Sequence, residues 1–200
     1  NGSSIPIGSI SMDVTNPKII NFRLNYTLNY SDEIKISYNG YQIVSTDGSN
    51  LELFSLKNVR NNVAFVHQIP TKIESESFTF QEGVELEETT DVGGGFNIAY
   101  LDPNDYLDYE INVKNSGEYQ INYRTAAQFG TGSIRLQFID TSGFISEIDN
   151  PIFLSTGNWQ SWKTTSEEVQ LKAGRYTMRV LITQAPFNLN WIEFVAKSLS

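Results

Sequence analysis

Short runs in which apolar and polar residues alternate, each closed by a turn signal, constrain the fold of this chain more than any other feature. In the first part of the chain such runs cover 18–28 and 33–38, and turn residues follow at Asn39-Gly40 and Asp47-Gly48. Alternation with a period of two is typical of a strand with one buried face, and Asn-Gly and Asp-Gly pairs are typical of hairpin turns. The sequence also contains 10 Tyr and 12 Phe, residue types that favour strands, and helical periodicity is weak throughout. The chain is therefore predicted to be all-β.

Beyond Pro70 the alternating runs come closer together and end at turns rich in Gly, Asn and Asp. The predicted strands are 72–80, 97–101, 106–113, 118–127, 133–140, 144–149, 151–154, 160–170, 174–182 and 189–195. So many short strands in a segment of this length are typical of a β-sandwich, here a jelly roll, whose loops gather at the two ends.

The character of the sequence changes near residues 69–71, which predicts two domains, 1–69 and 70–200. Residues 1–70 contain 5 basic and 5 acidic side chains, whereas residues 71–200 contain 9 and 18, so the net charge of −9 lies in the second part. An acidic surface without a basic stripe repels phosphate backbones, which argues against a nucleic-acid partner. The sequence has no apolar stretch of about 18 residues, so no membrane span is expected. Cysteine is absent, which excludes disulfides and thiolate metal sites.

Two glutamates, Glu74 and Glu76, stand two residues apart on the first predicted strand of the second domain. On a strand this spacing places both carboxylates on one face, where they repel each other unless a cation or solvent lies between them. A calcium site and a solvated acidic edge both fit this pattern. The three glycines Gly93–Gly95 lack the Lys-Ser/Thr and the following helix of a phosphate-binding loop, so they predict a tight turn instead.

Acidic residues around the strand 106–113 raise the question of catalysis by paired carboxylates, as in glycosidases. The candidates are Asp102, Asp105, Asp108 and Glu110. The last two share a strand face and alternate with apolar residues, which is typical of a solvated exterior. The single histidine, His67, has no nucleophile motif around it and is predicted to be packed or exposed. The chain is therefore expected to be a binding protein and not an enzyme.

The first domain resembles the C-terminal part of a bacterial immunoglobulin-like domain of the kind found between enzyme modules. The resemblance covers about 1–66 and depends on the segments NGSSIPIGSISMD, DEIKISYNG, STDGSNLELFS and VRNN. It implies a partial β-sandwich whose opening strands lie upstream, and therefore an unpaired sheet edge. No functional site is expected in this domain.

The second domain resembles a family 6 carbohydrate-binding module over about 71–196. The resemblance rests on IESES, GVELEETTDVGGGFNIAYLDPNDYLDYEINV, GEYQINYRTA, TGNWQSWKTT, LKAGRYTMRVLIT and FNLNWIEF. Members of this family are β-sandwich modules attached to secreted glycoside hydrolases, and they bind xylan, β-glucans or agarose, often at chain ends. The resemblance therefore implies a secreted or cell-surface bacterial protein whose partners are a neutral polysaccharide or oligosaccharide and a catalytic domain in the same parent chain.

The resemblance also assigns sugar-binding residues. Tyr100 and Trp159 match the two aromatic residues that sandwich a sugar ring, Asn188 matches the amide at the floor of that slot, and Glu87 matches a carboxylate that contacts a terminal hydroxyl. Flat side chains suit the faces of a sugar ring, because the C–H groups there are apolar and the hydroxyls lie at the rim. The alternative is that both aromatic residues belong to the sandwich core.

Two further assignments follow from the same resemblance. Tyr106 stands where the family often has a tryptophan, which makes it a candidate for a second glycan site on the sandwich face. A structural Ca²⁺ would be held by Glu74, Glu76 and Asn190 together with a backbone carbonyl near the glycine loop. A function of a different class stays open, namely a structural, spacer or adhesive pair of sandwiches that binds no glycan.

Overall fold

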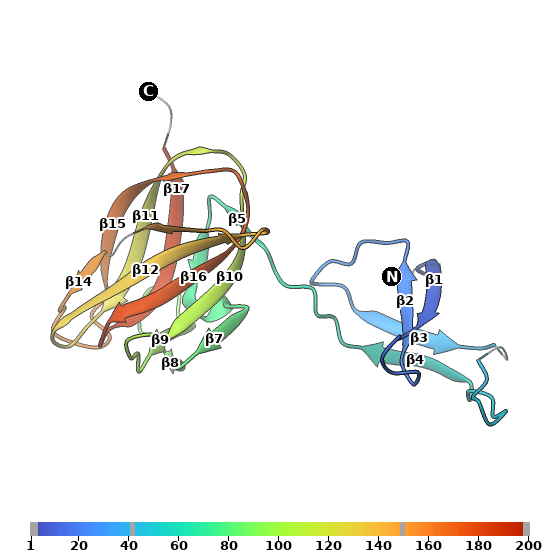
Figure 1. Ribbon diagram of the computed structural model, residues 1–200. Coiled ribbons are helices and arrows are strands. Elements are labelled where there is room, and N and C mark those ends of the chain that lie inside the picture. The colour runs from blue at the N-terminus through green and yellow to red at the C-terminus, as the bar shows by residue number, and fades with distance from the viewer. Residues whose placement is uncertain (1–3, 41–42, 149–150, 198–200) are drawn as a thin grey trace. The chain divides into compact units, whose positions relative to one another are not determined.

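The computed structural model describes residues 4–40, 43–148 and 151–197, and it divides the chain into two compact units, Asn1–Ala64 and Phe65–Ser200 (Figure 1). The division falls a few residues before the boundary predicted at 69/70. The strand β5 (His67–Ile69) pairs in parallel with β10 (Tyr106–Val113) of the second unit, with His67 opposite Ile111. Residues 67–69 therefore belong to the sandwich of the second unit.

The first unit consists of two separate antiparallel pairs of strands. β1 (Ile7–Met12) pairs with β2 (Ile20–Leu24), and β3 (Ile34–Tyr38) pairs with β4 (Phe54–Val59). Within the described part of this unit, residues 4–40 and 43–64, no side chain is fully buried. The described residues of the first unit therefore form strands without a closed hydrophobic core, and the immunoglobulin-like assignment stays a prediction.

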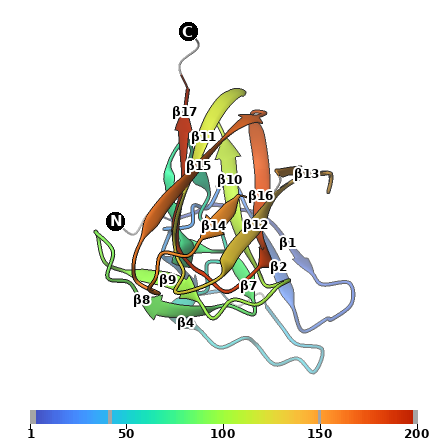
Figure 2. The same ribbon diagram turned by 90° about the vertical axis from the view of Figure 1, so that its left-hand side faces the viewer.

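The second unit is a sandwich of two sheets (Figures 1 and 2). The seven-stranded sheet has the order β13-β12-β16-β10-β5, with β14 on β12 and β7 on β10, and the six-stranded sheet has the order β15-β11-β17-β9-β8, with β6 on β17. The strands of this unit not yet given are β6 (Lys72–Glu74), β7 (Phe80–Glu82), β8 (Glu85–Glu88), β9 (Phe96–Ala99), β11 (Gly117–Ala126), β12 (Thr131–Asp140), β13 (Ile145–Ile148), β14 (Ile152–Leu154), β15 (Lys163–Leu171), β16 (Gly174–Gln184) and β17 (Asn188–Ala196). The predicted all-β chain and β-sandwich are confirmed.

The core lies between the two sheets and follows the alternation read from the sequence. On β10, Leu107, Tyr109 and Ile111 point inward and are 0% exposed, and on β11 Ile121 and Tyr123 do the same. Burial of a large apolar side chain contributes about 1.5–3 kcal/mol, so this layer is the main source of stability. The outward residues of the same strands are polar or aromatic and form the faces of the sandwich.

The prediction of one continuous strand over 72–80 is wrong, because the structure interrupts this segment in its middle. β6 ends at Glu74, a single 3₁₀ turn covers Ser75–Ser77, and β7 begins only at Phe80. The Ser75 hydroxyl donates to the carbonyl of Leu189 at 2.8 Å, which anchors the turn to the neighbouring sheet. No helix in the described ranges is long and apolar enough to cross a membrane.

Two other segments differ in smaller ways. Residues 85–88 were expected to lie in a loop but form β8, which pairs with β9. The predicted strand 144–149 is β13, and its last residue, Asp149, lies outside the described residues.

His67 is buried, at 6% exposure, and packs edge-on against Phe65, with 4.6 Å between the ring centroids. Burial lowers the pKa of His67 below its usual value, because the charged imidazolium loses hydration. The unfolded chain then binds the proton more readily, so stability falls as the pH falls through the ordinary histidine pKa. Between about pH 7.5 and about pH 5.5, we expect the midpoint of thermal unfolding to fall further in the wild type than in His67→Phe. Equal shifts in the two proteins, measured by circular dichroism, would assign the pH dependence to other groups.

Candidate functional site

A cavity of about 230 Å³ opens at one end of the sandwich of the second unit. The residues that line it are Glu87, Ala99, Tyr100, Trp159, Pro186, Phe187 and Asn188. All four residues predicted to bind a sugar ring, Glu87, Tyr100, Trp159 and Asn188, are among them. They come from β8, from the segment after β9, from the loop before β15 and from the start of β17. The fold thus brings side chains from four separate segments to one opening.

Tyr100 lies at the rim of this cavity with an unusual backbone. Its φ is +56°, in the left-handed region that costs a residue with a side chain roughly 1 kcal/mol or more, and the residue is 69% exposed. An exposed tyrosine gains little from burial, so packing does not offset this strain. The alternative that Tyr100 is a core residue is wrong.

Trp159 also lines the cavity and is half-buried. Its backbone carbonyl accepts a hydrogen bond from Asn188 Nδ2 at 3.0 Å, which fixes the loop that carries it to the start of β17. Its ring meets that of Phe129 edge to face, with centroids 5.4 Å apart and planes at 69°. The indole therefore stands at the cavity and is not part of the core between the sheets.

The floor of the cavity is built from an amide and a carboxylate. Asn188 is 4% exposed, and its Nδ2 donates both hydrogens, one to Glu87 Oε2 at 2.9 Å and one to the Trp159 carbonyl. With both donors used, Asn188 can offer a ligand only its acceptor Oδ1.

Glu87 is held by amide donors. Oε2 accepts from Asn188, from Gln160 Nε2 at 2.8 Å and from Asn97 Nδ2 at 3.3 Å. None of these three hydrogen bonds reaches Oε1, the second carboxylate oxygen. A carboxylate accepts but does not donate, so this oxygen can receive a hydroxyl from a ligand.

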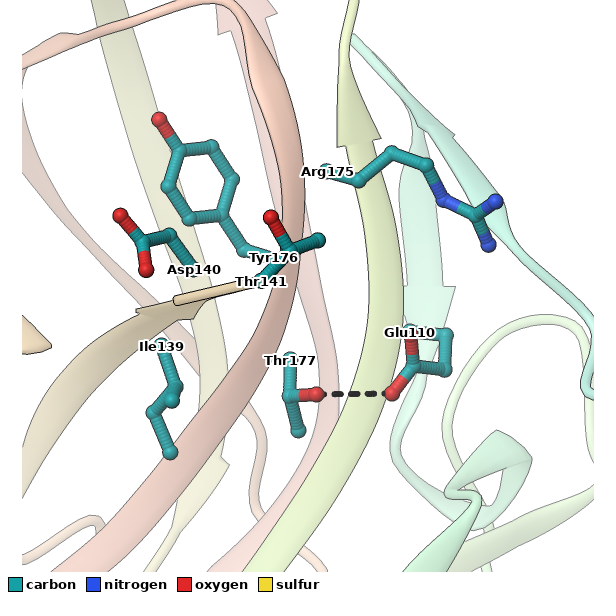
Figure 3. A pocket seen from close by; sticks show the side chains of 7 residues that line it. All are labelled: Glu110, Ile139, Asp140, Thr141, Arg175, Tyr176 and Thr177. Carbon is teal, nitrogen blue, oxygen red and sulfur yellow. Dashed lines mark hydrogen bonds between the residues drawn. The ribbon is translucent and has the colours of Figure 1, made fainter. Parts of the chain in front are cut away.

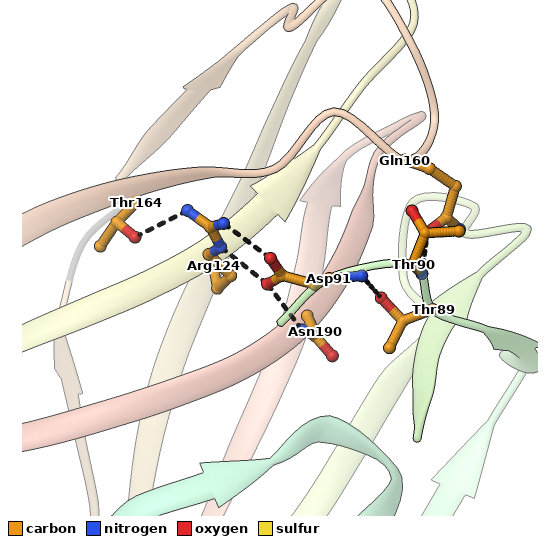
Figure 4. A network of polar contacts seen from close by, with 7 residues as sticks. All are labelled: Thr89, Thr90, Asp91, Arg124, Gln160, Thr164 and Asn190. Atoms are coloured by element: carbon orange, nitrogen blue, oxygen red, sulfur yellow. Dashed lines mark hydrogen bonds and ion pairs between the residues drawn. The ribbon is translucent and has the colours of Figure 1, made fainter. Parts of the chain in front are cut away.

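The acidic loop before the glycines is tied to the six-stranded sheet by a partly buried ion pair (Figure 4). Arg124 donates to both carboxylate oxygens of Asp91, at 2.8 and 2.7 Å, and the Asp91 side chain is 5% exposed. The Arg124 guanidinium, and to a lesser degree Asn190 Nδ2 at 2.9 Å, lower the pKa of the Asp91 carboxyl. Thr90 N in turn donates to Gln160 Oε1 at 2.9 Å, so the tethered loop also holds the side chain that orients Glu87.

The residues predicted to hold a cation are arranged differently from the prediction. Glu74 and Glu76 do not share a strand face, because the 3₁₀ turn intervenes, and the half-exposed Glu74 carboxylate pairs with Lys72 Nζ at 2.5 Å. Glu76 Oε1 accepts from Phe96 N at 3.2 Å, whereas Oε2 is buried without a hydrogen-bond partner among the described residues. A Cβ at Gly95 would lie 3.0 Å from Glu76 Oε1, so the carboxylate is pressed against the glycine loop.

A buried carboxylate oxygen without a hydrogen-bond partner is the kind of ligand that Ca²⁺ binds, so Glu76 fits a cation site. Asn190, at 3% exposure, could add its neutral Oδ1. In the described ranges no three His, Cys, Asp or Glu side chains cluster tightly enough to form a metal site on their own. A cation here would depend on backbone and amide oxygens.

The candidate for a second glycan site, Tyr106, lies on the outer face of the seven-stranded sheet. The Arg179 guanidinium lies over its ring at 3.8 Å, and Phe80 stacks against it with centroids 5.9 Å apart. Arg179 is fixed there by two hydrogen bonds of 2.8 Å to Asp108. Neighbouring side chains therefore already contact the Tyr106 ring, and Phe80, at 55% exposure, is the more open aromatic side chain of this face.

A second cavity, of about 190 Å³, is lined by Glu110 of β10, by the end of β12 with Thr141 after it, and by the start of β16 (Figure 3). Its lining is largely polar, and the Thr177 hydroxyl donates to Glu110 at 2.8 Å while the Arg175 side chain extends away from Asp140. The carboxylates weighed as catalytic residues are likewise engaged: Asp108 pairs with Arg179, and Asp105 accepts from the backbone N–H of Asp102 at 2.7 Å. Of these four carboxylates, only Glu110 lines either of the two cavities described above.

Three residues near the main cavity were not predicted from the sequence: Asp91, Gln160 and Phe129. Phe129 stands next to a glycine in a turn-like segment, where an aromatic side chain is not expected to be buried. An aromatic residue at such a place is the sequence signal that could have identified it. Asp91 is an acidic residue in an acidic loop, and Gln160 is an amide in a polar turn. No local sequence pattern distinguishes either of them from its neighbours.

The comparisons with known proteins concern the second unit. Residues 74–196 match the family described as carbohydrate binding module, family 6. The clotting factor G alpha subunit of Tachypleus tridentatus is 35% identical over 122 residues, an alignment that covers 60% of this chain and 18% of that protein. This chain therefore spans less than a fifth of the length of that relative.

Solved structures are similar over the same segment. The family 6 module of lichenase 5A from Cellvibrio mixtus, in complex with cellotriose, is 34% identical with a TM-score of 0.57, and the alignment covers 65% of this chain and 98% of that one. A β-1,3-glucan-binding family 6 module from Bacillus halodurans is 26% identical with a TM-score of 0.59 and coverages of 66% and 100%.

Proposed function

Because the chain belongs, through residues 74–196, to family 6 of the carbohydrate-binding modules, we propose that the cavity between Tyr100 and Trp159 binds a sugar ring of a neutral polysaccharide. We call this cavity the aromatic slot. The two side chains would cover the faces of the ring, and Glu87 and Asn188 would meet its hydroxyls.

The observation that carries the proposal is one cavity lined by two aromatic side chains, the exposed Tyr100 and the half-buried Trp159, above a floor of acceptors. The hydrogen bonds among Glu87, Asn188 and Trp159 do not use Glu87 Oε1 or Asn188 Oδ1, and both of these oxygens are acceptors. Sugar hydroxyls donate to such a floor, whereas a uronate or a sulfated sugar would bring a negative charge against Glu87. The net charge of −9 disfavours anionic glycans further.

We expect modest affinity, because a single ring in one slot offers few contacts. A dissociation constant in the micromolar to millimolar range corresponds to about 4–8 kcal/mol. A carboxylate at the floor favours recognition of a chain end, where a terminal hydroxyl can reach it. β-Glucan, xylan and agarose are the ligand classes to test.

Such a module has no need of catalysis. The unit would act outside the cell by holding an attached glycoside hydrolase close to its polymer, which raises the local concentration of the catalytic domain without adding chemistry.

The test is electrophoresis of the chain through native gels that contain laminarin, xylan, agarose or barley β-glucan. Retardation in at least one gel supports the proposal. Equal mobility in all four gels, compared with a gel without polymer, would contradict it, and release of reducing sugar from any polymer would instead indicate an enzyme.

A structural or adhesive role is the second candidate, and the first unit favours it. Its large apolar residues include Ile10 at 60%, Met12 at 59% and Leu56 at 69% exposure, and such surfaces are typical of protein contacts. This role predicts no retention by any glycan.

We also propose a structural Ca²⁺ bound by Glu76, with Glu74, Asn190 and a backbone carbonyl near Gly95 completing its ligands. The buried, unpartnered Oε2 of Glu76 supports this assignment. A bound ion would neutralise that carboxylate and join the 3₁₀ turn to the glycine loop and β17.

Removal of calcium should lower the thermal unfolding midpoint of the second unit. A ligand present at 100 times its dissociation constant stabilises the folded state by about 2.7 kcal/mol, and EDTA would remove this contribution. Glu76→Gln should unfold at the same temperature with and without EDTA, whereas Glu88→Gln, an exposed change on β8, should keep the wild-type difference. A wild-type melting curve that does not change in EDTA would contradict the proposed Ca²⁺ site.

A further inference from the structure

We infer that Gln160 is a positioning residue of the aromatic slot, which fixes the Glu87 carboxylate relative to the Trp159 wall. Gln160 itself does not belong to the residues that line the slot. The inference rests on the proposed function, because it concerns the same slot, and it assigns part of the affinity to a side chain that the ligand does not touch.

The side-chain amide of Gln160 has all of its hydrogen-bonding capacity in use. Nε2 donates to Glu87 Oε2 at 2.8 Å and to Asn97 Oδ1 at 3.1 Å. Oε1 accepts from both the backbone N–H and the hydroxyl of Thr90, at 2.9 and 3.3 Å. An amide turned over would bring Nε2 against the Thr90 N–H and Oε1 against the carboxylate, and these hydrogen bonds would be lost. The amide therefore has one orientation, in which it presents its donor to Glu87.

Glu87 and Trp159 are joined through Gln160 in a closed ring. Asn188 Nδ2 donates to Glu87 Oε2 at 2.9 Å and to the Trp159 carbonyl at 3.0 Å. Gln160 directly follows Trp159 in the chain and closes the ring through its own bond to Glu87 Oε2. This link is firm, because hydrogen bonds to an ionised acceptor are roughly twice as strong as neutral ones. Without the Gln160 amide the ring is open, and the carboxylate keeps only Asn188 and Asn97 as the donors described above.

The far side of Gln160 rests on a fixed support. Thr90 precedes Asp91, whose carboxylate accepts hydrogen bonds from Arg124 at 2.8 and 2.7 Å (Figure 4). Gln160 thus links Glu87 to a loop that is anchored to β11. A carboxylate held in this way has its free oxygen oriented before a ligand arrives, so less entropy is lost when a sugar hydroxyl binds to it.

The first test is Gln160→Ala in native gels that contain increasing amounts of laminarin, xylan, agarose or barley β-glucan. We expect binding to every polymer that retards the wild type to weaken by about three- to tenfold, the effect of losing one hydrogen bond that orients the floor. Gln120→Ala is the matched control, because the half-buried Gln120 also donates to a side chain, Asn122 Oδ1 at 2.7 Å on β11. This control should bind each polymer like the wild type.

Gln160→Glu tests whether the donor itself matters. The new side chain keeps an oxygen for Thr90 but sets a second carboxylate against Glu87, so at about pH 7.5 binding should be more than about tenfold weaker than in the wild type. Two carboxylates that share a site hold one proton between them at a higher pH than an isolated glutamate does. As the pH falls to about 5, that proton restores a donor, and binding should recover to within about threefold of the wild type.

The pH profile is a readout that loss of general support would not change. Among the described side chains that form hydrogen bonds with Gln160 in the wild type, only that of Glu87 is ionisable. Neither the wild type nor Gln160→Ala should therefore show the recovery at low pH.

A double replacement separates positioning from other effects. In a Glu87→Ala protein, Gln160→Ala should weaken binding by less than about twofold further, because no carboxylate is left to orient. Thermal unfolding followed by circular dichroism shows whether each variant is folded.

Three results would overturn the inference: Gln160→Ala that binds like the wild type, Gln160→Glu that does not recover at low pH, or an equal loss from Gln160→Ala with and without the Glu87 carboxylate. If Gln160→Ala does not fold, Gln160→Glu decides, since it keeps the contact with Thr90. Failure of the proposed function looks different: the wild type would run without retardation in all four gels, or Trp159→Ala would be retarded as strongly as the wild type. In that case there is no slot for Gln160 to position.

Discussion

Trp159→Ala is expected to abolish most glycan binding and to leave the fold intact. A tryptophan at the centre of a binding site typically contributes 2 kcal/mol or more, which is a loss of about 30-fold or more in affinity. Because the whole binding energy is expected to be about 4–8 kcal/mol, such a loss should bring the variant to the mobility of a non-binding protein in a polysaccharide gel.

The fold should survive because little of it depends on the indole ring. The hydrogen bond from Asn188 that secures this loop is made to the Trp159 carbonyl, which alanine retains, and the ring itself is only half-buried. Trp159→Phe should keep part of the affinity and Trp159→Leu very little, since leucine has apolar volume without a flat face. A Trp159→Ala protein that is retarded as strongly as the wild type would show that the slot is not the binding site.

The sandwich could be predicted because alternation is a short-range signal, whereas the lining of the slot was predicted through the resemblance to family 6. Alternation predicted the strands 106–113 and 118–127, whose inward residues include the buried Tyr109 and Tyr123, and the Gly-Asn pair before Trp159 is typical of a turn. The segment FNLNWIEF, which matches the family, predicted Asn188 at the floor of the slot. These signals lie within a few residues of the side chains they describe.

Other parts of the site depend on contacts between distant segments, which no local pattern encodes. The 3₁₀ turn that separates Glu74 from Glu76 is anchored by the bond from Ser75 to the carbonyl of Leu189, far along the chain. The ion pair between Asp91 and Arg124 likewise joins a loop to β11. In each case the sequence shows an ordinary polar residue, and only the folded chain reveals its partner.

The slot is made of loops, yet its floor is fixed by a connected set of polar contacts. Asp91 secures the acidic loop, Thr90 of that loop donates to Gln160, and Gln160 donates to Glu87. Pre-organised polar groups cost little to order when a ligand binds. In the proposed function this rigidity would compensate for the small contact area that one sugar ring offers, and Gln160 would be a positioning residue for Glu87.

Replacement of Tyr100 by glycine should separate stability from binding. At φ +56° glycine is unstrained, whereas tyrosine or alanine pays the cost of the left-handed region. Tyr100→Gly should therefore be more stable to urea than Tyr100→Ala by about 0.5–1 kcal/mol. The stability of Tyr100→Gly should be similar to that of the wild type or higher, because the tyrosine is 69% exposed and buries little surface. Both variants lack the ring and should lose retardation in polysaccharide gels to the same extent.

The comparison between the two variants is its own control, since they differ only in one methyl group at a strained position. If Tyr100→Ala were the more stable of the two, the backbone strain at this residue would not exist in solution. If Tyr100→Gly still bound glycan like the wild type, the ring would not be a wall of the slot. The expected result, a protein that is as stable as before but no longer binds, would mean that the strained tyrosine is present for the ligand, since the fold itself has no need of it.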